Sequence, residues 1–394
     1  MDPPDAHPGA GKLGPIHSRP VAGGQEIEDV QAPQAGAGVR DGAATLRVLA
    51  QTAYPLSAPS PRVRIASFVP FLRPHGVTLD VHPTMTDAEY AVISSRASAL
   101  RKSCVLTAAL SRSLLHRRPE HDLLLVQRLR LLTPVPGLDP PRRVDVYDLD
   151  DALFIGSPSA VNRRFQWIKQ DTRRCGAYLR RAKLVIAGNS FLAAEANRHA
   201  RRVEIVPSCV DPARQDLHVH EERDVVVVGW IGSRTTSAYL PTVLPAMERL
   251  NRGRLRAKLV LVGADPALKA PWIEHRPWSL AAENGHLASF DIGIMPLPDT
   301  EWARGKCGYK VLQYFAAGVP AVASPVGVAP ELIGQDRGLL AASSEDWQAA
   351  LEQLIADVEE RRQRGAAARQ FVERYYSYQR WAPELASLLR SVPA

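Results

Sequence analysis

The chain has 394 residues, of which 45% are hydrophobic and 23% are charged. This composition is typical of a globular protein with a sizeable core, and the length corresponds to two or three domains. No apolar run approaches the roughly 18 residues that a membrane-spanning helix needs, so we expect no transmembrane segment. The formal net charge of +8 fits nucleic acid, anionic lipid or phosphorylated ligands as partners, and also an Arg-rich proteome.

Residues 1–44 are rich in Pro, Gly and Ala and show no hydrophobic periodicity. Such a segment cannot bury enough apolar surface to offset its ordering entropy, so we predict a disordered tail, with a propeptide or docking arm as the alternative. It has no basic stretch followed by an apolar one, and we expect no secretory signal. The four cysteines are widely spaced without a C-x-x-C pair, which favours the reducing cytoplasm over a disulfide framework or zinc module.

Strands and helices alternate after this tail. A strand over 46–50, a helix over 62–73 and a strand over 77–81 form the start of a doubly wound parallel sheet. We therefore predict that residues 45–207 form one Rossmann-like α/β domain. Its further strands are expected at 123–126, 144–147, 184–187 and 203–206.

A polar stretch over residues 208–223 separates two apolar strands and is the predicted linker. A second alternating series follows, so residues 224–377 are predicted to form a second Rossmann-like domain that faces the first across a ligand cleft. Residues 378–394 are expected to form a helix that crosses back to the first domain. The strands of the second series are expected at 225–231, 258–262, 291–295 and 319–323.

The first strand of the second domain leads into a candidate phosphate loop. The strand ends at Gly232 and Ser233, and a helix is predicted to follow over 237–250. Free amides and the dipole at a helix start attract phosphate, and a glycine lets the backbone approach it closely. Ser233 and Thr235 can donate hydrogen bonds, and Arg234 can add charge. An ordinary helix N-cap is the alternative interpretation.

A second constellation surrounds a predicted helix over 308–318. Lys306, Lys310 and Gln313 follow one another at spacings of four and three residues, which places them on one helix face. Two cations and an amide on one face suit a nucleotide diphosphate and a ribose diol. The alternative is a solvated helix face.

Carboxylates gather at the end of a strand in the first domain, over Asp148–Asp151. A divalent-metal site is one interpretation, but the phosphate loop lies in the other domain, so we expect no metal here. Asp150 or Asp151 is better placed to accept the proton of an acceptor hydroxyl or to orient the acceptor. Capping of the next helix is the alternative. Arg64 follows the first strand and is expected either to meet a phosphate or to lie exposed on a helix face.

Several of these strings together resemble a known family. The chain resembles the donor half of the family-4 glycosyltransferases of GT-B fold, the "glycosyl transferases group 1" type. The resemblance lies in segments 229–233, 291–297, 305–320 and 324–327, and in Glu331. The Asp-rich run over 147–152 resembles a signature common in one bacterial branch of that family. The resemblance extends from about Leu46 to Leu389.

The resemblance implies a retaining, metal-independent transfer of a sugar from a nucleotide-sugar to a hydroxyl acceptor, which is a glycan, glycolipid or small molecule. The first domain would hold the acceptor and the second the donor. Gly232 and Ser233 match the pyrophosphate loop of the family, and Gln313 falls where the second Glu of its E-x7-E motif binds the ribose. The first Glu of that motif falls at Gly305, so this chain departs from the family where the transferred sugar is usually addressed.

The phosphate site also departs from the family in part. The family usually has an Arg and a Lys in its pyrophosphate site. In this chain only the Arg is found, as Arg234, and Lys306 or Lys310 could supply the second positive charge. The incomplete motif leaves an alternative function, a catalytically silent nucleotide-binding subunit that supports a partner transferase. A nucleic-acid-binding protein is suggested by charge alone, and because no basic motif interleaved with aromatic residues is present, we expect no nucleic acid as partner.

Basic residues concentrate in the predicted acceptor domain. This pattern suits peripheral contact with an anionic membrane face or a polyprenyl-phosphate-linked acceptor, and a solvated Arg-rich surface is the alternative. No pair of histidines with H-x3-H spacing is found, so no metal cofactor is expected. The basic residues are Arg112, His116, Arg117, Arg118, Arg163, Arg164, Lys169, Arg173, Arg174, Arg180, Arg181 and Lys183.

Overall fold

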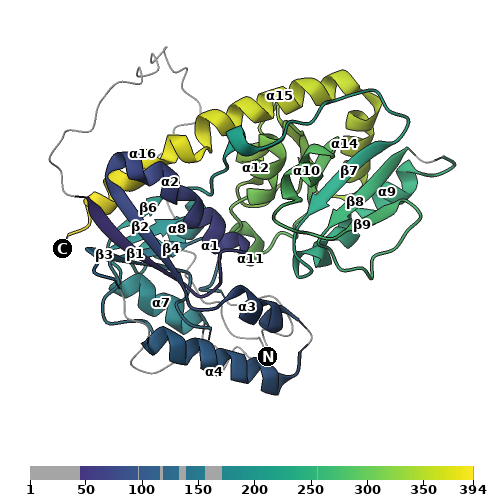
Figure 1. The fold of residues 1–394 in the computed structure, drawn as a ribbon. Helices are drawn as coiled ribbons and strands as arrows, with labels where there is room; N and C mark the ends of the chain where they lie inside the picture. Colours follow the sequence, from purple (N-terminus) through teal and green to yellow (C-terminus); the bar gives the residue numbers. More distant parts are fainter. Residues whose placement is uncertain are drawn as a thin grey trace, which may run out of the picture. The chain divides into compact units, whose positions relative to one another are not determined.

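A computed structural model of the chain describes residues 45–95, 97–115, 119–132, 139–155, 171–254 and 256–393. The predicted tail over 1–44 lies outside these residues. Within them the strands form two six-stranded sheets, and every strand pair is parallel (Figure 1). The predicted fold class, an α/β protein with two Rossmann-like sheets, is confirmed.

The first sheet has the strand order β2-β1-β3-β4-β5-β6. All residues of the inner strands β3, β4 and β5 are buried, because helices cover parallel sheets on both faces. Its strands are β1 (Leu46–Thr52), β2 (Val77–Pro83), β3 (Leu123–Gln127), β4 (Val146–Leu149), β5 (Leu184–Ala187) and β6 (Val203–Ile205).

The single helix predicted over 62–73 is wrong in detail. Ile65 leaves the helical conformation with φ −124°, and Pro70 has no N–H to bond the preceding turn. Short helical segments therefore take its place: α1 (Pro59–Arg64), the 3₁₀ helix η1 (Ala66–Phe68), α2 (Val69–Leu72) and the 3₁₀ helix η2 (Arg73–His75). The remaining described helices of this part are α3 (Asp87–Ser94), α4 (Ala99–Leu115), α7 (Asp171–Arg181) and α8 (Ser190–Asn197).

The second sheet has the strand order β12-β11-β10-β7-β8-β9. The strand series predicted from the sequence lacked β9 and β12, which are short strands at the two edges of the sheet. The strands are β7 (Val226–Ile231), β8 (Ala257–Val262), β9 (Ile273–Arg276), β10 (Ile292–Met295), β11 (Ala321–Ala323) and β12 (Gly338–Leu340).

Helices pack on both faces of this sheet, and two apolar clusters form its core. Gly293 in β10 illustrates the fit, since an added Cβ would lie 2.3 Å from the ring of Tyr314. The helices are the 3₁₀ helix η4 (Thr236–Thr242), α9 (Leu244–Leu250), α10 (Glu283–Ala288), α11 (Glu301–Arg304), α12 (Tyr309–Ala316), α13 (Ala329–Ile333), α14 (Ser344–Ala356) and α15 (Val358–Tyr375).

The last helix, α16 (Tyr378–Arg390), continues the direction of α15 and lies beside α2 (Figure 1). Its apolar face joins the core cluster of the first sheet, where the Tyr378 ring meets Phe68 edge to face, with the ring centroids 4.8 Å apart. The Tyr378 hydroxyl donates to the Val63 carbonyl at 3.1 Å. The exact domain limits at 45–207, 208–223, 224–377 and 378–394 stay predictions.

Candidate functional site

The strand order of the second sheet reverses between β7 and β10, which is where ligands bind in open parallel sheets. The predicted phosphate loop follows β7 at this point. Gly232 lies directly against Lys310 of α12, because an added Cβ at Gly232 would lie 2.8 Å from Lys310 Cε and 2.6 Å from the Trp230 ring. The structure thus brings together the loop and one of the lysines that the sequence had singled out.

Lys310 is a half-buried cation beside the loop. Within the described part of the chain it has no ion-pair partner, and its ammonium lies 5.6 Å from the centroid of the Trp230 ring. Burial, and secondarily the charge of Lys306, lowers the pKa of Lys310 to about 8. A desolvated ammonium beside a glycine loop attracts an anion, which would restore the ordinary pKa of the lysine.

The rest of the loop differs from the prediction. The helix expected over 237–250 is instead η4 followed by the short α9, because Pro241 and Pro245 interrupt the ladder of N–H donors. The expectation of a long helix whose dipole faces the loop is therefore wrong. Thr235 precedes η4 without a side-chain cap, and the Ser233 N–H donates to Thr236 Oγ1 at 3.3 Å.

Arg234 extends from the same loop toward solvent. Its guanidinium Nη2 lies 3.4 Å from Asp265 Oδ2, and the side chains of Arg234 and Asp265 are 53% and 38% exposed. An exposed pair of this kind is weak and exchanges easily for another anion. The prediction that Arg234 contacts a phosphate stays open.

The predicted common face of Lys306, Lys310 and Gln313 is only partly correct. Helix α12 begins at Tyr309, after Gly308 in the left-handed conformation with φ +66°. Lys306 therefore precedes the helix, whereas Lys310 and Gln313 lie on it. Gln313 is buried, and its predicted role at the ribose stays a prediction.

The first sheet contributes an acidic cluster at the ends of β1, β3 and β4, where its own strand order reverses. Asp150 directly follows β4. One of its oxygens accepts from the Ser60 hydroxyl, and the other accepts from Gln127 Nε2 at 3.2 Å. Gln127 also donates to Ser60 Oγ at 2.8 Å. These bonds orient Asp150 without neutralising it.

Arg128 is a member of this cluster that the sequence analysis missed. Its guanidinium lies 3.1 Å from Asp151 Oδ2 and 3.6 Å from Asp150 Oδ1. Burial lowers the pKa of Arg128, but the two carboxylates outweigh burial and raise it. Arg128 also adopts φ +60°, a strained conformation for a residue other than glycine, and such strain gathers at functional sites. Its position after a buried strand, at the reversal of strand order, was the available signal.

Asp151 connects the acidic cluster to the part of the chain that carries the second sheet. Lys306 Nζ lies 2.9 Å and 3.1 Å from the two oxygens of Asp151. Next to it, Asn189 Nδ2 donates to the carbonyls of Gly305 and Lys306 at 3.2 Å. Gly305 admits no side chain, because an added Cβ would lie 2.7 Å from Ala152 Cβ. The missing Glu of the family pattern is therefore excluded by close packing in this arrangement.

Arg64 is a correction to the sequence analysis. It is only 3% exposed, so it is not a surface arginine. Its guanidinium lies 2.6 Å from Asp148 Oδ2 and donates to the Val206 carbonyl at 2.7 Å. The side chain lies inward because Asp148 neutralises its charge, and the guanidinium is not exposed to a phosphate at the surface.

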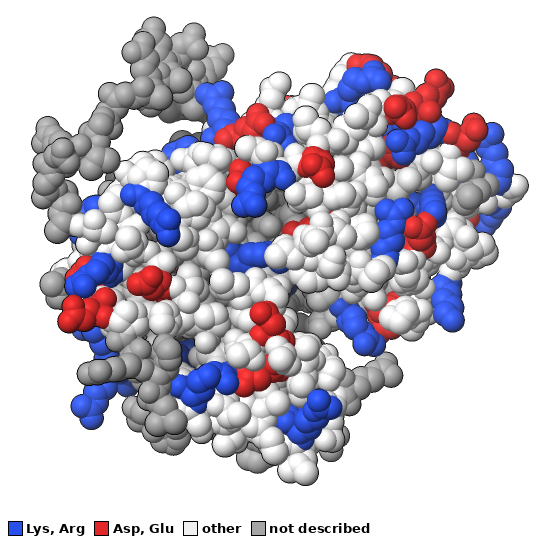
Figure 2. Space-filling model, in the orientation of Figure 1, with Lys and Arg blue, Asp and Glu red and all other residues white. Residues whose placement is uncertain are grey.

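Three of the described basic residues around the first sheet have local ion-pair partners. Arg174 pairs with Asp139, Lys183 with Asp145 at 3.0 Å, and Arg112 with Glu89 at 2.5 Å. On the face shown in Figure 2, Lys and Arg alternate with Asp and Glu, with no continuous basic patch. The predicted membrane contact gains no support from these pairs. Arg163, Arg164, Lys169, His116, Arg117 and Arg118 lie outside the described residues.

None of the helices in the described ranges is both long and apolar enough to cross a bilayer.

Comparisons with known proteins agree on one class. Residues 222–357 match the family model for glycosyl transferases group 1. No match was found among curated proteins. Among solved structures, sucrose-phosphate synthase from Thermosynechococcus elongatus is similar at 14% identity and a TM-score of 0.65, over 88% of this chain and 98% of the other.

Two further structures show the same fold. One is WaaG, a glycosyltransferase involved in lipopolysaccharide biosynthesis, at 13% identity and a TM-score of 0.57, over 88% of this chain and 100% of the other. The second is Alr3699/HepE of Anabaena in complex with UDP and glucose, at 15% identity and a TM-score of 0.58, over 89% and 100%.

Over residues 222–357, which carry the second sheet, the chain matches the family that the resemblance of its sequence predicted. Its overall fold is that of these solved structures, which is the predicted GT-B fold.

Proposed function

We propose that this protein is a retaining glycosyltransferase that transfers a sugar from a nucleotide-sugar to a hydroxyl acceptor without a metal ion. The observation that carries the proposal is the position of Lys310. A desolvated cation without an ion-pair partner in the described residues lies against the glycine loop at the strand reversal of the second sheet. A diphosphate supplies the charge that this position lacks.

The leaving diphosphate determines how such a site accelerates transfer. As the bond to the anomeric carbon breaks, negative charge grows on the diphosphate and positive charge grows on the sugar ring. Lys310 stabilises the diphosphate, and Arg234 and Lys306 add charge at its edge. Gly232 contributes by allowing close approach of the backbone, since its own N–H donates to the Val262 carbonyl at 3.0 Å. Fixed cations in a desolvated site need no reorganisation during the reaction, which is why they replace a metal ion in this proposal.

The acidic cluster of the first sheet handles the acceptor. Asp150, oriented by Ser60 and Gln127, or Asp151, paired with Arg128, accepts the proton of the attacking hydroxyl or orients it. The Lys306 to Asp151 pair links this cluster to the phosphate side. Donor phosphates that attract Lys306 leave Asp151 with one cation fewer, which makes it a better base when the donor is bound.

The proposal also names a donor nucleotide and an acceptor class. A structural neighbour binds UDP and glucose, so UDP-sugars are the first donors to test, with Gln313 at the ribose. We place the reaction in the cytoplasm, in keeping with free thiols at all four cysteines. The acceptor in this proposal is a hydroxyl group of a glycan, a glycolipid or a small-molecule glycoside.

A thermal-shift panel of UDP-, GDP-, TDP- and ADP-sugars tests the proposal. We expect one nucleotide-sugar to raise the melting temperature and to be hydrolysed slowly, with water replacing the acceptor. If none stabilises the chain and it instead binds RNA or DNA in a salt-sensitive manner, the proposal is wrong.

One observation favours a second candidate function. Gly305 stands where the family places its first Glu, and close packing against Ala152 leaves no space for that side chain. A chain that binds the nucleotide but has lost contact with the sugar would be a catalytically silent subunit that supports a partner transferase. Stabilisation by a nucleotide-sugar without any turnover would identify this case.

A further inference from the structure

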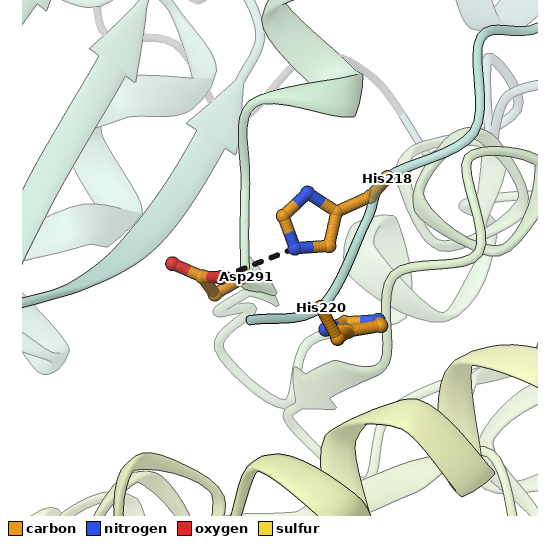
Figure 3. A group of neighbouring side chains, drawn as sticks. All are labelled: His218, His220 and Asp291. Atoms are coloured by element: carbon orange, nitrogen blue, oxygen red, sulfur yellow. Dashed lines mark hydrogen bonds and ion pairs between the residues drawn. The ribbon is translucent and has the colours of Figure 1, made fainter. Parts of the chain in front are cut away.

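A buried cluster of two histidines and an aspartate lies outside the proposed transfer site. His218 and His220 lie in the stretch between β6 and β7, and Asp291 directly precedes β10 (Figure 3). All three side chains are buried. The sequence shows only the H-x-H pair, because Asp291 is 71 residues from His220.

The hydrogen bonds of the two rings show which nitrogen of each donates to the backbone. A carbonyl oxygen can only accept, so His218 Nδ1 donates to Ala288 at 2.8 Å and His220 Nε2 donates to Gly318 at 2.9 Å. The remaining atoms are His218 Nε2, which lies 3.1 Å from Asp291 Oδ1, and His220 Nδ1.

A second, independent observation that points to a ligand concerns His220 Nδ1. It is buried, and within the described part of the chain it has no hydrogen-bond partner. A buried acceptor without a partner costs free energy, so its retention needs an explanation.

The three side chains are arranged as metal ligands. One ligand atom from each residue lies within 4.8 Å of the others. The opposite nitrogen of each histidine donates to a backbone carbonyl, and Asp291 Oδ2 accepts from the Val227 N–H at 2.8 Å. Such outer bonds hold metal-binding side chains in orientation in known metal sites.

We propose that His218, His220 and Asp291 form a binding site for one divalent transition-metal ion of the zinc type. Two imidazoles and a carboxylate are ligands that Zn²⁺ accepts, and a water molecule would complete four-coordination. The ion would fasten the segment between the sheets to the start of β10, away from Lys310 and the glycine loop. The inference therefore does not depend on the proposed transfer reaction.

Two cations near the cluster oppose the ion. Arg223 Nη1 lies 3.8 Å from Asp291 Oδ2, but its side chain is about one-third exposed and can turn to solvent. Arg361 is buried, and its guanidinium donates to the carbonyls of Leu354 and Glu221. The competing structure is a metal-free hydrogen bond from His218 Nε2 to Asp291 Oδ1, which leaves His220 Nδ1 without a role.

Direct titration with metal alone distinguishes the two structures. The tag-free full chain is dialysed against EDTA, and Zn²⁺ is then added in a calorimeter. We expect one ion per chain with a dissociation constant of about 1 µM or tighter, and a rise in melting temperature. His220→Leu is expected to weaken binding at least 100-fold, whereas the matched variant His275→Leu, at an exposed histidine, binds as the wild type does.

Co²⁺ provides a readout of the ligands themselves. Bound Co²⁺ is expected to give visible absorption bands of a four- or five-coordinate site, and Asp291→Asn, which keeps the side-chain shape, is expected to weaken and shift them. If His220→Leu does not fold, this variant still tests the site. The proposal is overturned if the wild type binds neither ion below about 100 µM, or if the variants at His220 and Asp291 bind as the wild type does.

Discussion

Replacing Lys310 with methionine tests the phosphate site through stability as well as binding. Methionine keeps the length of the apolar stem and removes the charge. The pKa of Lys310 falls from its ordinary 10.5 to about 8 on folding. This difference corresponds to about 3 kcal/mol against the charged, folded form. Because the side chain is partly exposed, we expect Lys310→Met to raise the free energy of unfolding by about 1–2 kcal/mol at pH 7.

The pH dependence of the free energy of unfolding checks the sign of this effect of Lys310. Between pH 8 and pH 10.5 the unfolded chain holds a proton at Lys310 that the folded chain has released, so the wild type gains stability as pH rises through this window. The advantage of Lys310→Met should therefore be full below pH 8 and vanish near pH 10.5. Urea unfolding followed by circular dichroism at pH 7, 9 and 10.5 measures this trend.

Binding of the nucleotide-sugar should change in the opposite direction. Removing the cation is expected to weaken binding by about 10- to 100-fold, as for the loss of a charge-assisted hydrogen bond. In the wild type, affinity should fall as pH rises through about 8. Lys102→Met, on α4 of the other sheet, is the matched control. If Lys310→Met lowers stability at pH 7 and leaves nucleotide binding intact, Lys310 is a structural residue and the reasoning is refuted.

Three further substitutions test neighbouring features. Gly305→Glu, which restores the family pattern, should lower the free energy of unfolding in urea by about 1–3 kcal/mol, because the added Cβ meets Ala152. Unchanged stability would show that this contact opens freely. Arg64→Met should lower the free energy of unfolding by about 3–5 kcal/mol, because it leaves the Asp148 carboxylate buried and unpaired. Nucleotide binding measured by calorimetry should not weaken; weaker binding at unchanged stability would restore Arg64 to the phosphate site. Asp151→Asn should slow nucleotide-sugar hydrolysis by about 10²-fold or more while nucleotide affinity changes less than about threefold, and wild-type turnover would exclude Asp151 as the base.

The sequence predicted the features that depend on local pattern. Apolar runs separated by helical periods were sufficient for two parallel sheets, and the loop at Gly232 and the lysine at 310 were identified from residue type and spacing. Pro241 and Pro245 were also visible in the sequence, and giving weight to their missing N–H groups would have corrected the helix predicted over 237–250.

Features that depend on distant partners could not be predicted in this way. Arg64 is buried because Asp148, 84 residues away, neutralises it, and nothing local distinguishes it from a surface arginine. The strained conformation of Arg128 likewise follows from its neighbours in the fold. The H-x-H pair gained meaning only when β10 brought Asp291 beside it.

The slow hydrolysis of a nucleotide-sugar tests the central claim most directly. The nucleotide-sugar that stabilises the chain is incubated with the wild type, Lys310→Met and Lys102→Met, and the released nucleoside diphosphate is quantified. The account predicts release by the wild type and by Lys102→Met, and at least a tenfold loss in Lys310→Met. Equal release by all three, or no release from any nucleotide-sugar by the wild type, would contradict it.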